Sequence, residues 1–200
     1  IRDRFSFLLF PVVLLLLFFV GMQQGSFDTT VENLFQAIFS YNSEKAEHFV
    51  LMELRLPRLL LAFFVGGALA LSGYLMQVMV NNPLADPYLL GTSSGAGLGI
   101  SIFFAGFLSY NLIAVSVVAF LGALLVTLLA TFIAYKQKRI DPSRLLLAGL
   151  ALSALMVSLT SLVMYLAVDQ NVFKNVIYWT MGGFDHARFI HIPIIALSLI

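Results

Sequence analysis

Long apolar stretches alternate with short polar ones along most of the chain. A helix needs about 20 mostly apolar residues to cross the hydrocarbon layer of a bilayer, where backbone polar groups must be bonded within the protein. Five stretches meet this requirement and a sixth begins near the end of the sequence, at residues 5–22, 59–80, 88–108, 111–135, 145–168 and 190–200. The pattern predicts an all-α fold, a polytopic bundle of transmembrane helices.

The segment 23–54 is too polar to span a membrane. Its apolar residues recur at near-helical spacing, at Phe27, Leu34, Phe35, Ile38 and Phe39. We expect this segment to lie along the outer membrane surface.

Two further features concern how the spans connect. Because only a short turn around Ser109 and Tyr110 separates two spans, we expect them to be antiparallel neighbours. The first span also resembles a signal peptide, since Arg2 and Arg4 precede it. It is long for the apolar part of such a peptide and no small-x-small cleavage site follows, so a retained span is favoured.

Composition supports a membrane protein. The chain is 60% hydrophobic and 10% charged, against roughly 45–50% apolar and roughly 25% charged residues in soluble domains. The net charge of +1 gives no basic surface for nucleic acid. Because cysteine is absent, disulfides, thiolate nucleophiles and Cys-ligated metal sites are excluded for these residues.

The positive-inside rule places the amino terminus in the cytoplasm. This orientation puts six basic residues inside, namely Arg2, Arg4, Lys136, Lys138, Arg139 and Arg144. Five basic residues then lie outside, but seven of the ten acidic residues lie there with them.

Small and hydroxyl residues form stripes on the spans. Gly66, Gly73 and Gln77 share one face of the second span, which we expect to contact another helix or line a path. Ser158 and Ser161 lie on one stripe of the fifth span, and either bond backbone carbonyls in a packed bundle or face a water-filled path. No span carries a charge near its centre, which argues against a proton-driven carrier.

The loop Asn81-Asn82-Pro83-Leu84-Ala85-Asp86-Pro87 is the most specific local pattern. Two prolines four residues apart exclude a continuous helix and favour a rigid turn at the inner membrane face.

This loop and four other strings resemble the FecCD family of binding-protein-dependent ABC permeases, which import ferric siderophores, haem and cobalamin. The other strings are Leu54-Arg55-Leu56-Pro57-Arg58-Leu59, Leu89-Leu90-Gly91-Thr92-Ser93-Ser94-Gly95-Ala96, Ser143-Arg144-Leu145-Leu146-Leu147-Ala148-Gly149 and Tyr178-Trp179-Thr180-Met181-Gly182-Gly183. They cover about residues 54–100 and 143–183 in the family's order.

The resemblance implies a transport permease rather than an enzyme, with residues 1–200 as the amino-terminal part of one transmembrane domain of about ten spans. It implies a bacterial cytoplasmic (inner) membrane protein that pairs with a second permease subunit, as a homodimer or a heterodimer. The other implied partners are two cytoplasmic ATPases, which bind ATP-Mg, and an extracytoplasmic substrate-binding protein. No cofactor is expected on this chain.

Two sets of site residues follow from the resemblance alone. Arg55 and Arg58 would dock carboxylates of the binding protein, although arginines beside Pro57 could instead snorkel at the interface. The cytoplasmic gate and translocation path would include Asn82, Leu84, Pro142 and Ser143. Asp141-Pro142 stands where relatives often have Ser or Thr, and a purely structural turn is the alternative.

Other classes fit less well. The glycine-rich string after Leu90 lacks the Lys of a phosphate-binding loop, and His186 and His191 lack the spacing of a zinc pair. A membrane enzyme would need an intramembrane nucleophile with a base, or a pair of acidic or histidine residues. An ion-gradient-driven secondary transporter is the remaining alternative.

Overall fold

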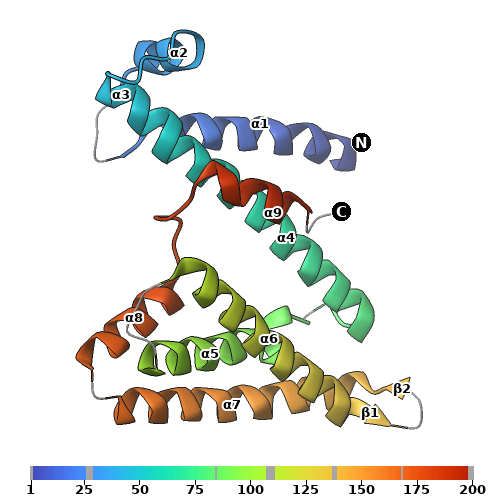
Figure 1. Cartoon of the computed structure of the whole chain (residues 1–200). Helices are drawn as coiled ribbons and strands as arrows, with labels where there is room; N and C mark the ends of the chain where they lie inside the picture. Colours follow the sequence, from blue (N-terminus) through green and yellow to red (C-terminus); the bar gives the residue numbers. More distant parts are fainter. Residues whose placement is uncertain are drawn as a thin grey trace. The chain divides into compact units, whose positions relative to one another are not determined.

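Nearly all regular structure in the computed structural model is helical (Figure 1). The structure describes residues 2–25, 29–83, 85–106, 111–136, 139–167 and 169–197. The elements in chain order are α1 (Arg2–Gln23), α2 (Val31–Phe39), α3 (Ala46–Phe49), the π-helix η1 (Val50–Arg55), α4 (Leu56–Val80), the 3-10 helix η2 (Pro87–Leu90), α5 (Thr92–Gly106), α6 (Leu112–Ala134), β1 (Tyr135–Lys136), β2 (Arg139–Ile140), α7 (Pro142–Leu166), α8 (Gln170–Met181), the 3-10 helix η3 (Phe189–His191) and α9 (Ile192–Leu197). The predicted all-α class is confirmed, since β1 and β2 form only a short antiparallel ribbon.

Three helices of the described chain are long and apolar enough to cross a membrane, namely Ala46–Val80, Leu112–Ala134 and Pro142–Leu166. They correspond to the predicted spans 59–80, 111–135 and 145–168. Residues Leu9–Gln23 of α1 form a shorter apolar helix within the predicted first span, and η3 and α9 begin the predicted last one.

The predicted span 88–108 is not one helix. Residues 87–90 form η2, Gly91 has a left-handed φ of 81°, and α5 covers only 15 residues. Because glycine tolerates this φ, the chain can turn at position 91 before the helix starts.

The segment 23–54 also needs correction. Its middle forms α2 as the spacing predicted, but residues 46–55 form α3 and η1, which continue into α4 without a break. Pro57 does not start the helix, because the backbone before it bonds in the π pattern: the N–H of Leu56 donates to the carbonyl of Leu51. A π-turn of this kind accommodates the proline's missing donor.

The chain forms two compact units, which we describe separately: residues 1–69 with 184–200, and residues 70–183. In the first unit, the end of α1 packs against α2 and η1 around a small core. Its buried members are Met22, Leu34, Ala37 and Leu51.

The second unit is built on α5, α6 and α7, with α8 and the β1–β2 ribbon at opposite ends of α7 (Figure 1). A Cβ added to Gly95 would lie 2.5 Å from the carbonyl oxygen of Gly122, and one added to Gly99 would lie 2.8 Å from that of Val118. Four residues further along α5, from Gly95 to Gly99, the neighbour on α6 is four residues earlier in the chain, Val118 instead of Gly122. This confirms the predicted antiparallel pair, and the two helices approach closely at these glycines.

The helix α8 has no counterpart among the predicted elements. The side chain of Asp169 caps it by accepting a 2.8 Å bond from the N–H of Asn171. Val172 and Val176 are buried in a core shared with Phe103 and Phe104 of α5. Gly182, at φ 73°, ends α8.

Candidate functional site

Arg55, at the end of η1, is turned into the first unit, and only 8% of its surface is exposed. Its Nη1 donates to the carbonyl of Met22 at 2.7 Å, to that of Gln23 at 3.0 Å and to Thr29 Oγ1 at 2.8 Å. The last carbonyls of a helix have no partner within the helix, and they form the negative end of its dipole. Arg55 therefore acts as a cap that ties α4 to the end of α1.

Arg58, one turn later, is partly exposed. Its Nη2 donates to the backbone carbonyl of Asp185 at a long 3.4 Å, and its buried Nε has no hydrogen-bond partner. The two arginines predicted to act as a docking pair thus have different environments, and Arg58 is the more available of the two.

The helix α4 ends before the two prolines, and the described residues of the loop form turns. Asn81 has a left-handed φ of 52°, which asparagine tolerates better than most residues. The carbonyl of Asn82 accepts a 3.1 Å bond from the N–H of Ala85. Asp86 Oδ1 accepts a 2.8 Å bond from the N–H of Tyr88 and caps η2. The predicted gate residue Leu84 lies outside the described residues.

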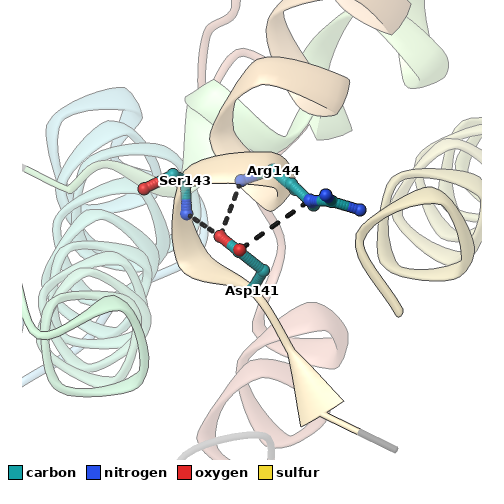
Figure 2. A network of polar contacts seen from close by, with 3 residues as sticks. All are labelled: Asp141, Ser143 and Arg144. Atoms are coloured by element: carbon teal, nitrogen blue, oxygen red, sulfur yellow. Dashed lines mark hydrogen bonds and ion pairs between the residues drawn. The ribbon is translucent and has the colours of Figure 1, made fainter. Parts of the chain in front are cut away.

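The start of α7 carries the other predicted gate residues. Asp141 Oδ1 accepts bonds from the backbone N–H groups of Ser143 at 2.9 Å and Arg144 at 3.1 Å, and Asp141 Oδ2 lies 3.8 Å from Arg144 Nε (Figure 2). Both charged side chains are about half exposed, so this ion pair adds little stability. Asp141-Pro142 stands where relatives often have serine or threonine. Aspartate caps a helix as well as those residues do, so the cap at the start of α7 is preserved.

These two segments meet at one end of the second unit. Their apolar residues belong to one buried cluster, made up of Met76, Val80, Ala85, Leu90, Ala130, Ala134, Leu145 and Ala148. A Cβ added to Gly149 of α7 would collide with the carbonyl of Leu89. Asn82 is half-buried beside this cluster, whereas Pro142 and Ser143 are exposed.

The residues predicted to line a path or pack helices behave differently on α4 and α7. A Cβ added to Gly66 or Gly73 would meet nothing within 4 Å, and Gln77 is exposed. The helix contact or path predicted for this face stays a prediction. Ser158 and Ser161 are exposed, and their hydroxyls donate to the carbonyls of Ala154 and Val157 at 2.9 and 3.0 Å.

The comparison with known families decides what kind of protein carries this arrangement. Residues 13–200 match the model of the FecCD transport family. The chain belongs to the FecCD transport family. This family is one of transport proteins, and a transporter is therefore favoured over an enzyme.

Curated relatives agree with this assignment of the FecCD chain. It is 40% identical over 143 residues to the vitamin B12 import system permease protein BtuC of Escherichia coli O139:H28 (strain E24377A / ETEC), and 41% identical over the same length to that of Salmonella newport (strain SL254). These matches cover 71% of the chain but only 43% of each relative.

A solved structure shares the fold of the FecCD chain. It is described as an inward-facing conformation of a metal-chelate type ABC transporter, and it matches with a TM-score of 0.76 at 23% identity. The match covers 94% of this chain and 56% of that one.

Sequence reasoning missed two features of this FecCD chain. The cap made by Arg55 depends on partners 26 to 33 residues away, for which no local pattern exists. The helix α8 did leave a signal, because Val172, Val176 and Trp179 recur at helical spacing after the capping residue Asp169. Among the described residues, no group of three or more His, Asp or Glu side chains is placed to hold a metal ion.

Proposed function

We propose that this chain is part of the transmembrane permease subunit of an ABC importer, which moves a ferric siderophore, haem or cobalamin-type chelate into the cytoplasm. The observation that carries the proposal is the family match over residues 13–200, together with 40% identity to a vitamin B12 import permease. ATP would be hydrolysed by partner subunits. A chelated cargo needs no ligand from the protein, which suits surfaces of small and hydroxyl residues such as those on α7.

The proposed partners are a second permease subunit, two cytoplasmic ATPases and an extracytoplasmic binding protein. Docking of the binding protein is proposed for Arg55 and Arg58, since guanidinium groups donate paired hydrogen bonds to carboxylates. Arg58 supports this role better because it is partly exposed. Arg55 could join only if it gave up its bonds to α1 and Thr29.

The proposed cytoplasmic gate lies where the loop after α4 meets the start of α7. Asn82, Leu84, Pro142 and Ser143 keep this role as a proposal. The shared buried cluster supports it, because a displacement of one segment would be transmitted to the other through packed side chains. We propose that Ser158 and Ser161 line the path, together with the open α4 face of Gly66, Gly73 and Gln77.

Uptake into vesicles tests the function. The full-length permease and its ATPase subunits are reconstituted with ATP trapped on the side that carries the ATPases and binding protein on the other side. We expect cobalamin, haem or a ferric siderophore to accumulate with ATP and not with a non-hydrolysable analogue.

Uptake that follows an imposed proton or sodium gradient without ATP would contradict the proposal and favour a secondary transporter. The cargo itself is identified by comparing growth of a deletion strain on the three chelates. A strain impaired on none of them would contradict the proposed substrate class.

A further inference from the structure

The helix α2 buries one apolar stripe and exposes a second one. Leu34 and Ala37 lie in the core of the first unit, with 5% and 0% of their surfaces exposed. The adjoining arc of the helix carries four large apolar side chains that are 45–80% exposed: Val31, Phe35, Ile38 and Phe39. We call these four residues the outer face of α2.

The remaining arc of α2 is polar and internally bonded. Gln36 Nε2 donates to Glu32 Oε1 at 3.2 Å, and Lys45 Nζ donates to Gln36 Oε1 at 3.4 Å. Thr30 caps the start of the helix by accepting a bond from the N–H of Asn33. The polar groups therefore gather away from the outer face, as in helices that lie in the plane of a membrane surface.

The core contacts of α2 set its depth relative to the hydrocarbon layer of the membrane. Leu34 and Ala37 pack with Met22 and Phe18, in the last two turns of α1. The 22 residues of α1 are about 33 Å long at 1.5 Å per residue, close to the thickness of the hydrocarbon layer, about 30 Å. From Leu9 to Val20 the surface of α1 is itself lined by exposed apolar side chains. The helix α2 therefore begins where a lipid-exposed helix reaches the edge of the hydrocarbon layer.

We propose that α2 lies in the headgroup region of the leaflet in which α1 ends, with its outer face inserted into the acyl-chain boundary. Phe35 and Phe39, whose rings stack with centroids 6.5 Å apart, form the centre of the inserted surface. Lipid is the partner that fits, because the outer face carries no charge and belongs to a helix that packs against the end of the apolar helix α1.

Site-directed spin labelling tests this placement. Single cysteines replace Phe35 and Phe39 on the outer face and, as matched controls on the same helix, Glu32 and Gln36. The full-length permease, with any other cysteine removed, is labelled and reconstituted in phosphatidylethanolamine–phosphatidylglycerol vesicles. Relaxation is then measured with oxygen, which concentrates in lipid, and with a nickel chelate, which stays in water.

At positions 35 and 39 we expect oxygen to enhance relaxation several-fold more than the nickel chelate does. At positions 32 and 36 we expect the chelate to enhance relaxation more than oxygen does. Chelate access at positions 35 and 39 would overturn the proposal. So would exclusion of both reagents there, which would show the outer face covered by another part of the permease or a second subunit. Chelate access that disappears only when binding protein is added would assign the face to protein docking instead.

Discussion

Two arginines three positions apart on the same helical segment have opposite environments. Arg55 is buried with three bonds from Nη1, whereas Arg58 is partly exposed with one bond of 3.4 Å. The difference arises because the face that carries Arg55 points toward the end of α1. At the residue scale, the structure gives Arg55 a capping role, whereas the resemblance implied docking for both arginines, and docking by Arg58 stays a prediction.

This separation predicts different effects of removing each side chain. Arg55→Ala removes the donor to the carbonyl of Met22 and one of the two donors to that of Gln23, and we expect a loss of about 1–3 kcal/mol in the free energy of unfolding. Arg58→Ala should cost less than about 1 kcal/mol, because a single long bond is lost. Thermal or denaturant unfolding of the purified permease in detergent measures both.

Binding-protein affinity is the second measurement for the same pair. We expect Arg58→Glu to weaken docking while leaving stability almost unchanged. Equal loss of stability in the two alanine variants would contradict the capping role of Arg55, and unchanged docking of the Arg58→Glu permease would contradict the docking role of Arg58.

Close contact between α5 and α6 depends on glycine at specific positions of the two helices. Gly95 and Gly122 approach each other so closely that a Cβ on either one would collide with the other's carbonyl. Gly97, on another face of α5, has nothing within 4 Å of the position its Cβ would take. At the element scale, α5 therefore carries one glycine at a close helix contact, Gly95, and another with free space around it, Gly97.

We predict that Gly95→Ala destabilises the permease by about 1–3 kcal/mol, because the added methyl group forces the helix backbones apart. Gly97→Ala is the matched control, and we expect it to be neutral or stabilising by up to about 1 kcal/mol, since alanine favours the helix. Unfolding curves and the yield of monodisperse protein report the effect. A Gly95→Ala variant as stable as the Gly97→Ala one would refute the close packing.

The orientation of the chain concerns the whole molecule. The two ends of α7 lie in different structural settings: the capped start beside the β1–β2 ribbon and the end leading into α8 (Figure 1). Its 25 residues span about 37 Å, enough to cross the hydrocarbon layer. The positive-inside rule puts the start of α7, with Arg144, in the cytoplasm.

Cysteine labelling checks this orientation. We expect Ser143→Cys, at the exposed start of α7, to react with a membrane-impermeant maleimide only after cells are opened. Asn171, on α8, is exposed. Asn171→Cys should react in cells whose outer barrier has been made permeable while the cytoplasmic membrane stays closed. The reverse pattern would invert the proposed topology and remove the gate from the side of the ATPases.

The sequence alone determined the helical class, three of the six predicted spans, the antiparallel α5–α6 pair and the turn after α4. These features depend on local quantities: the length of an apolar stretch, the length of a connection, and proline or glycine at a given position. Tertiary structure decided the rest. Arg55 is a cap because Met22, 33 residues earlier, lies beside it, and Leu34 and Ala37 are buried because they share a core with Met22 of α1. Such contacts join residues far apart in the chain, so they follow from how the helices are placed and not from the pattern along any one of them.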